Sequence, residues 1–407
     1  MVLYTLSTMV MKTNDYCKLF IWGFKLYLMA PLMWPTLSFA VKTVSLIIQV
    51  SLSIFVSVGL ILYLYDHITD FGKATNIMCI IMFILMGIYK LTVLWYKSDE
   101  LKALFNIILT EFWPYNLINL ESKRKVKEMY NLMNVLIWCF FWGGFIYGLL
   151  YQIPPLFKTN GLIYPVAYPF DWTASPWYQI VYFTQAFVQS ITSLVTTGAD
   201  FLVLGGLLSI TSLYCILQEC VEIFNTPEMY VTNKRLREII NDGLENKYTD
   251  ERREYFVRCV RHHQLILRFT KQFNNAMNPL ELYQLFVSIF GLCLGALGVA
   301  NLELAGTVAE QGINFLYLYG FILQLFIDCF FGTYLYHQAS LLPDAIFHSN
   351  WRMLEDKELK KDFAFLLQNS QRIPQFNAYN LYDMHMDSFV KVIKVAFSFY
   401  TILSKLK

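Results

Sequence analysis

The final twenty residues, SFVKVIKVAFSFYTILSKLK, combine an apolar helix pattern with side chains that could contact ions or water. Their polar residues follow one another in steps of three or four, so in a helix they share one face: Lys391, Lys394, Ser398, Thr401 and Lys405. The other faces carry Val, Ile, Phe, Ala and Leu. Such a stripe is typical of a helix that lies on a membrane or faces water inside one.

Two other groups of residues could carry chemistry, but neither predicts an enzyme. His262 and His263 are adjacent, so on a helix they point in different directions and could not hold one metal well. We interpret them as a solvated or interface pair. Cys215 and Cys220 lack a matching His or Cys pair, and no nucleophile–base, phosphate-loop or dinucleotide motif occurs. We therefore expect no enzymatic activity, no metal and no cofactor.

The composition indicates an integral membrane protein. Of the 407 residues, 56% are apolar, 17% aromatic and only 15% charged, against roughly 25% charged residues in ordinary soluble domains. The net charge of +2 gives no indication of a nucleic-acid partner. We also expect no cleaved secretory signal, because the first residues lack a basic start before an apolar core.

Seven stretches are long and apolar enough to cross a bilayer, at about residues 43–65, 74–96, 129–157, 172–199, 282–302, 312–336 and 380–403. Pro154 and Pro155 should end the third helix early. The fourth stretch stays apolar to Leu217, so we expect its helix to leave the membrane and continue into a buried cytosolic layer. Asp328 lies inside the sixth stretch; we interpret it as a structural polar contact near the inner membrane face, with an ion pathway as the alternative.

Lys and Arg residues in the connecting segments predict the orientation. Twenty-five lie on the side of the N-terminus, and only Lys73 and Lys158 lie on the other. The positive side of a membrane protein is the cytosolic one, so we expect a cytosolic N-terminus and an extracellular C-terminus. The long cytosolic connections contain amphipathic helix patterns, which predict a cytosolic helical anchor layer.

These features disfavour other seven-helix classes. The orientation is opposite to that of receptors that signal through G proteins, and neither D-R-Y after the third span nor N-P-x-x-Y in the seventh is present. A transporter would be expected to show internal repeats or broken helices, and neither is evident. Both classes remain as weaker alternatives.

The last 80 or so residues resemble the insect odorant receptors. The resemblance rests on Cys-x-x-Gly, on HQASLLPDAIFHSNW, on FAFLLQNSQRIPQFNA and on FVKVIKVAFSFYTIL, with the matching positions Cys329, Gly332, Ser340, Ala345, Trp351, Gln371, Pro374, Ala378, Phe389, Lys394, Ser398 and Leu403. The related gustatory receptors, a further alternative, end in a pattern with Gln-Phe that is missing here. The fourth-to-fifth connection, about residues 224–278, is shorter than in the family's coreceptor, so the chain is similar to an odour-specific tuning subunit.

The resemblance implies a heterotetrameric, ligand-gated, non-selective cation channel that contains the coreceptor and resides in the plasma membrane of olfactory sensory neuron dendrites. It implies three regions: residues 1–336 with six spans, the ligand pocket and their cytosolic extensions; residues 337–379 as a cytosolic anchor; and residues 380–407 as the pore-lining seventh helix. The resemblance places the gate at Ile402, whereas the polar stripe alone favours Thr401.

The resemblance also places a small, mostly apolar volatile between the outer halves of the second to sixth helices. With the spans above, those halves contain the candidate ligand residues Cys79, Ile80, Phe83, Phe141, Gly144, Tyr147, Tyr178, Tyr182, Phe187, Leu294, Phe315 and Tyr319. Aromatic walls with a few hydroxyl groups suit such a ligand. For each aromatic residue, ordinary helix packing is the alternative. Gly144 could mark either a close helix contact or room for the ligand.

Overall fold

The computed structural model describes residues 25–114, 117, 120–153, 161–240, 242–300 and 308–405. Lys12, Lys18, Lys158 and Lys407, which bear on the predicted orientation, lie outside these residues. Tyr147 and Lys405 belong to helices, but their side chains are outside the described part of the structure.

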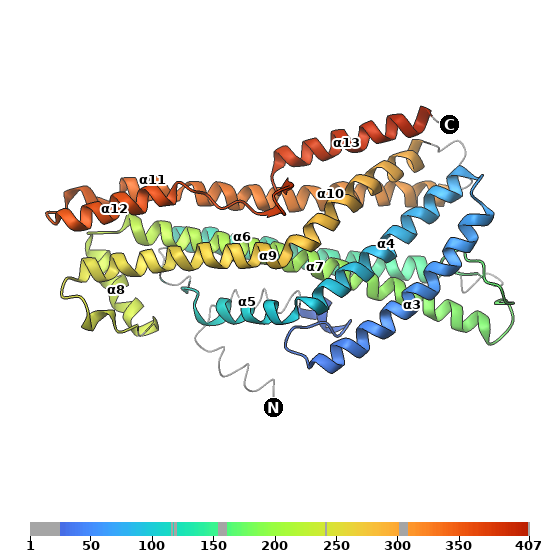
Figure 1. Cartoon of the computed structure of the whole chain (residues 1–407), viewed down its shortest axis with the longest axis horizontal. Coiled ribbons are helices and arrows are strands. Elements are labelled where there is room, and N and C mark those ends of the chain that lie inside the picture. Colours follow the sequence, from blue (N-terminus) through green and yellow to red (C-terminus); the bar gives the residue numbers. More distant parts are fainter. Residues whose placement is uncertain are drawn as a thin grey trace.

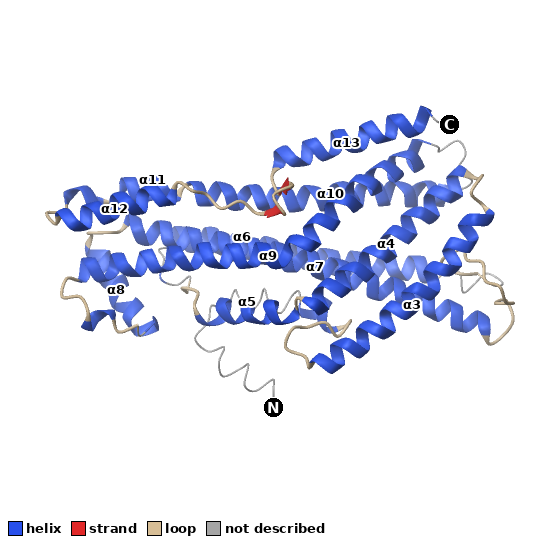
Figure 2. Ribbon diagram, in the orientation of Figure 1, coloured by secondary structure: helices blue, strands red, loops and turns tan. Residues whose placement is uncertain are grey.

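Helices account for nearly all of the described chain (Figure 2). The long helices are α3 (Phe39–Asp66), α4 (Phe71–Tyr96), α6 (Leu120–Gln152), α7 (Trp177–Glu222), α9 (Glu251–Ala300) and α10 (Val308–Ser340). Shorter elements are α5 (Ser98–Thr110), α8 (Pro227–Ile240), η4 (Leu244–Asn246), α11 (Leu342–His348), η5 (Asn350–Met353), α12 (Lys357–Ser370), β1 (Asn377–Ala378), β2 (Tyr382–Asp383) and the last helix α13 (Met386–Lys405).

The helix ends follow from local sequence. Ser38, Asp70 and Asp356 precede α3, α4 and α12, and each side chain accepts a hydrogen bond from a backbone N–H of the first turn. Helix α6 ends at Gln152, before Pro154, as the sequence predicts. Pro279 lies inside α9, which bends midway along its length (Figure 1). A proline removes one helical hydrogen bond and explains such a bend.

Within the described residues, six helices are long and apolar enough to cross a membrane: α3, α4, α6, α7, α9 and α10. They coincide with the first six predicted stretches, so the all-α membrane fold is confirmed. Its orientation stays a prediction. Helix α13 is not among the six; Asp387, Lys391 and Lys394 fall in its first nine residues, and its side chains from residue 403 onward are outside the described part of the structure. It also begins at Met386, six residues after the predicted start, since residues 377–383 form the hairpin of β1 and β2.

Two helices are more than twice as long as a bilayer is thick. Helix α7 has 46 residues and α9 has 50, which at 1.5 Å per residue is about 70 and 75 Å, whereas a hydrocarbon core measures about 30 Å. Helices α7, α9 and α10 pack side by side, and α11 and α12 lie near the C-terminal ends of α7 and α10 (Figure 1). The predicted continuation of the fourth span as a buried helix is confirmed, since nearly every residue of α7 from 199 to 221 is buried.

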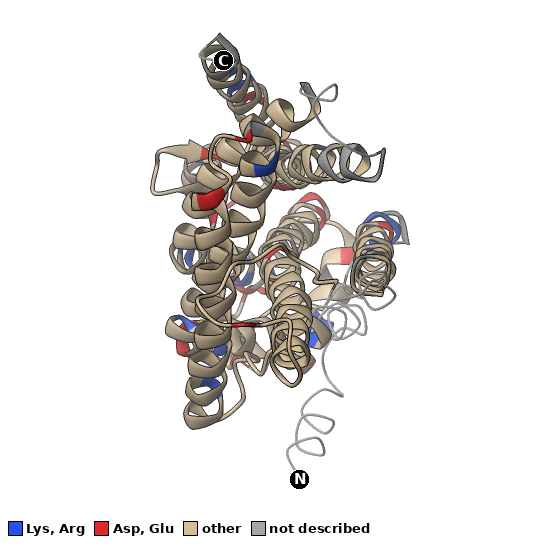
Figure 3. Ribbon diagram, turned by 90° about the vertical axis from the view of Figure 1, so that its right-hand side faces the viewer, with Lys and Arg blue, Asp and Glu red and all other residues tan. Residues whose placement is uncertain are grey.

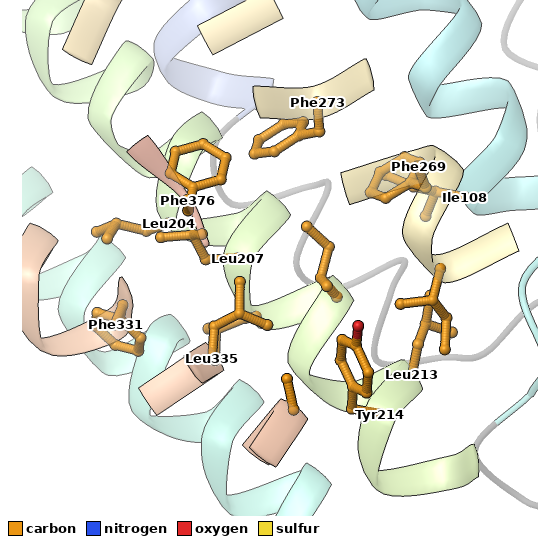
Figure 4. Close-up of a cluster of buried hydrophobic side chains, with 14 of the residues drawn as sticks. Ile108, Leu204, Leu207, Leu213, Tyr214, Phe269, Phe273, Phe331, Leu335 and Phe376 are labelled. Carbon is orange, nitrogen blue, oxygen red and sulfur yellow. The ribbon is translucent and has the colours of Figure 1, made fainter. Parts of the chain in front are cut away.

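The extended ends of these helices enclose one apolar core. Leu207, Leu213 and Tyr214 on α7 meet Phe269 and Phe273 on α9 (Figure 4). Ile108 of α5 and residues of α10 and of the segment before β1 complete the cluster. Burying each of these side chains contributes about 1.5–3 kcal/mol, so this part of the molecule is held by its own packing rather than by lipid.

Ion pairs fasten α8 to α9 outside the apolar spans. Arg258 donates to Asp242 Oδ1 at 2.7 Å and to Glu254, which also accepts from Arg237. Burial raises the pKa of Asp242, but hydrogen bonds from Arg258 and its positive charge outweigh that effect, so the pKa lies below its ordinary value. These contacts hold α8 against the start of α9, while the cytosolic location of this part of the molecule stays a prediction.

Candidate functional site

Four ionisable residues lie at one level of the bundle, and we call them the charged layer: Lys90 on α4, Asp200 on α7, Glu281 on α9 and Asp328 on α10. Counted from the helix ends at the α3–α4, α6–α7 and α9–α10 connections, they lie 19, 23, 19 and 20 residues along, about 29 to 35 Å at 1.5 Å per residue. That distance matches the roughly 30 Å hydrocarbon thickness. The charged layer therefore marks one boundary of the membrane-spanning half.

Within this layer, Asp200 is fully partnered. Lys90 Nζ donates to Asp200 Oδ1 at 2.5 Å, and Gln324 Nε2 of α10 donates to Oδ2 at 2.6 Å. The Lys90 side chain is only 1% exposed. Three helices, α4, α7 and α10, are thus joined through one carboxylate.

A cavity of about 250 Å³ opens above the charged layer, between α4, α6, α7 and α10. We call it the deep cavity. Asp200, Gln324 and Asp328 form its polar end. The remaining wall is mostly apolar and aromatic, and includes Phe83, Phe140, Phe201, Leu316, Gly320 and Phe321. Concave, mostly apolar space with a few convergent polar groups is the usual form of a small-molecule site.

A second cavity of about 280 Å³ lies between α6 and α7, and we call it the lateral cavity. Phe141, Gly144 and Gly148 line one side, and Gln152 and Ser190 supply polar groups. A Cβ atom placed on Gly144 or Gly148 would meet nothing within 4 Å, so Gly144 provides space rather than a close helix contact. Phe140 and Thr197 line both cavities, which therefore adjoin.

The predicted ligand residues fall in different places. Phe83 lines the deep cavity, and Phe141 and Gly144 line the lateral cavity. Phe187 borders a much smaller cavity between α4 and α7. Tyr147 lies on α6 three residues after Gly144, and its side chain is outside the described part.

The other candidates are packed or exposed. Cys79 and Ile80 are buried, and Ile80 shares an apolar cluster with Tyr182. The hydroxyl of Tyr178 donates to Gly161 O at 2.9 Å and that of Tyr182 to Gln152 O at 2.5 Å, so both serve the backbone.

Leu294 is half-buried on α9. On α10, Phe315 and Tyr319 are 51% and 62% exposed, one turn apart on the outer surface. The twelve residues are therefore not gathered around one cavity, and the ligand site stays a prediction.

Helix α13 packs on α9 and α10 along one face only. Val392 and Ala396 are buried in that face. Lys391, Lys394 and Ser398 are exposed. Seen end-on, α13 projects from one side of the bundle (Figure 3). The polar stripe therefore points away from the rest of the chain.

The gate candidates differ in exposure. Ile402 is 57% exposed, whereas Thr401 is partly buried and its hydroxyl donates to Ser398 O at 2.8 Å. With 3.6 residues per turn, Ile402 lies about 20° from Lys391 around the helix and Thr401 about 80° in the other direction. Ile402 thus lies on the exposed surface just beyond Lys391, at the edge of the polar stripe rather than within it, and which of the two residues forms the gate stays a prediction.

The sequence reading missed the contact of Lys90 with Asp200 and Gln324. A signal was present: Lys90 is the one charge within the second apolar stretch, and Asp200 ends the fourth. Two lone opposite charges at equal depth in neighbouring spans are a candidate pair. Asp328 is buried in the same layer. His262 and His263 are also buried rather than solvated, and the His262 ring stacks on Trp113 with centroids 4.0 Å apart.

Comparison with known proteins identifies the same architecture elsewhere. The family described as 7tm Odorant receptor matches residues 70–397. Odorant receptor 83a of Drosophila melanogaster is 24% identical over 288 residues, which cover 62% of this chain and 62% of that receptor. Odorant receptor 85c of the same fly is 22% identical over 372 residues and 88% of both chains. The structure of the olfactory receptor OR5 from Machilis hrabei in complex with eugenol superposes with a TM-score of 0.75 at 15% identity, covering 97% of this chain and 100% of that one.

Proposed function

Because the chain belongs to the insect odorant receptor family, we propose that it is the odorant-binding tuning subunit of a ligand-gated, non-selective cation channel. The family match from residue 70 to 397 carries this proposal, because it extends from α4 to within α13. The two cavities and the outward polar stripe of α13 support it, as each offers one of the two parts that a ligand-gated channel needs.

The proposed conduction path runs along α13. A lone helix in lipid would hold Lys391 and Lys394 at a cost of several kcal/mol each. Around a shared axis of four subunits, the same lysines would face water, and Ile402 would form an apolar constriction that closes by losing its water. The outward direction of the stripe is what this arrangement requires.

The proposed partner is the odorant receptor coreceptor. Four copies of this chain would place eight lysines from positions 391 and 394 around one vestibule, which opposes cation entry. A heterotetramer that includes subunits without these lysines has fewer positive charges around the vestibule and therefore opposes cation entry less.

The proposed ligand is a small volatile that binds by burial of its apolar part with one or two hydrogen bonds. The deep and lateral cavities, about 250 and 280 Å³, suit a molecule of that size. The structurally similar olfactory receptor OR5 from Machilis hrabei is known in complex with eugenol.

The proposed setting is the plasma membrane of olfactory sensory neuron dendrites, with the C-terminus outside. Residues 337–379, which contain α11 and α12, then form the cytosolic anchor between the six spans and the pore helix. Helix α10 continues to Ser340, so the span and its cytosolic extension are one rigid element.

Co-expression tests the proposal. Cells that express this chain with a coreceptor should give odour-evoked cation currents with some volatile of a broad panel, and cells that express this chain alone should give none. Robust current from this chain alone, or none from the pair at confirmed surface expression, would contradict it.

A further inference from the structure

The charged layer contains more carboxyl groups than cations. Its carboxyl groups are those of Asp200, Glu281 and Asp328, and its cation is Lys90. Lys90 and Gln324 already occupy both oxygens of Asp200. Two carboxyl groups are thus left over in a buried place, where an uncompensated negative charge is costly.

Asp328 differs from Glu281 in its position. Both residues are 5% exposed, but only Asp328 is among the residues that line the deep cavity. Among the described residues, no hydrogen bond or ion pair joins its carboxyl group to another side chain. An unpartnered carboxyl group at the end of a cavity is a binding group for a ligand of opposite charge.

The remaining wall of the deep cavity favours the same ligand. Phe83, Phe140, Phe201 and Phe321 surround the space above Asp328. Aromatic faces attract organic cations and also bury hydrocarbon. Gly320 leaves room on the α10 side, since a Cβ there would meet nothing within 4 Å.

We propose that the deep cavity binds a small volatile amine in its protonated form, with the ammonium group paired to Asp328 and the hydrocarbon part among the phenylalanine rings. The inference rests on the proposed function and specifies its ligand class. The ammonium supplies the cation that the charged layer lacks, so binding is favoured by charge compensation as well as by burial.

The test compares two ligands of one skeleton: 2-phenylethylamine and 2-phenylethanol. In the heteromer with a coreceptor, the amine should activate at a concentration at least tenfold below that of the alcohol. Asp328→Asn should raise the half-maximal concentration of the amine at least tenfold and that of the alcohol less than threefold. Glu128→Gln, the same kind of change at a residue exposed on α6, is the matched control and should alter neither.

A binding measurement separates this inference from the proposed function. For the purified chain in detergent, 2-phenylethylamine should raise the unfolding temperature, and it should lose this effect in Asp328→Asn but keep it in Asp328→Glu. If Asp328→Asn does not fold, Gly320→Leu, which fills the cavity from α10, should abolish the effect instead. The inference would be overturned if 2-phenylethanol stabilised or activated the protein as well as 2-phenylethylamine does. It would also be overturned if Asp328→Asn raised the half-maximal concentrations of the amine and the alcohol equally. An absence of all odour-evoked current together with intact amine binding would count against the channel function alone.

Discussion

Lys90 of α4 and Asp200 of α7 form an ion pair with Nζ and Oδ1 2.5 Å apart, at the level where the apolar spans end. The lysine is 1% exposed and the aspartate side chain 23%. Gln324 of α10 donates to the second oxygen of Asp200, so this contact decides how three helices meet. It also defines the polar end of the deep cavity.

Breaking this pair should strongly destabilise the protein. Lys90→Met leaves a largely buried carboxylate without its cation, which costs about 3–5 kcal/mol. Thermal unfolding of the detergent-solubilised chain measures the loss. Lys73→Met, which removes an exposed ion pair to Asp70 at 3.0 Å, is the control and should cost less than about 1 kcal/mol. Equal effects of the two substitutions would show that the Lys90 pair does not hold the helices.

Phe83→Ala should reduce odorant potency without changing surface expression. The ring lines the deep cavity, and losing an aromatic contact with a ligand costs about 1 kcal/mol or more, roughly a fivefold shift. Dose–response curves of the heteromer measure the shift in potency. Tyr147→Ala tests in the same way the predicted ligand residue that follows Gly144 on α6. Phe365→Ala on α12, where the ring is 68% exposed, serves as the control. Unchanged curves for every active odorant would exclude the proposed pocket.

Gly144→Leu should weaken responses to odorants that use the lateral cavity. The leucine side chain enters open space beside Phe141, so the fold tolerates it while the ligand volume shrinks; we expect a loss of about tenfold in potency, or about 1.4 kcal/mol. Gly143→Leu is a matched control one residue away, also with nothing within 4 Å of its Cβ. Identical dose–response curves for both variants and the natural chain would place the ligand elsewhere.

Ile402→Ala should increase current in the absence of ligand. A smaller side chain at an apolar constriction lets water remain in the closed pore. Lys405→Glu should raise the permeability of divalent over monovalent cations by reversing a charge near the pore mouth. Whole-cell recording of the heteromer measures both, with Phe397→Ala, exposed on the flank of α13, as the control. If Ile402→Ala leaves the ligand-free current unchanged and Lys405→Glu leaves the ion permeability ratio unchanged, α13 does not line the conduction path.

A tag after Lys407 should stain on intact cells. The 25-to-two division of Lys and Arg predicts that the C-terminus lies outside. A cytosolic tag at the N-terminus is the control and should stain only after permeabilisation. The reverse pattern would contradict the orientation and, with it, the direction of the proposed pore.

The sequence by itself determined the membrane class and the first six of the seven predicted spans, because a bilayer demands about twenty apolar residues per helix wherever the chain crosses it. It also predicted the continuation of α7 beyond the membrane, since its apolar run to Leu217 is too long for one crossing. These are local properties that helix periodicity and length express directly.

Only the tertiary structure decided which residues meet. The contact of Lys90 with Asp200 joins positions 110 apart, and that of Asp200 with Gln324 joins positions 124 apart. Helix periodicity assigns each residue a face, but the rotation and depth of one helix against another follow from packing between distant segments. For the same reason, Phe83, Tyr182 and Phe315, which the sequence assigned to the outer halves of their helices, lie respectively in a cavity wall, a packed cluster and an exposed surface.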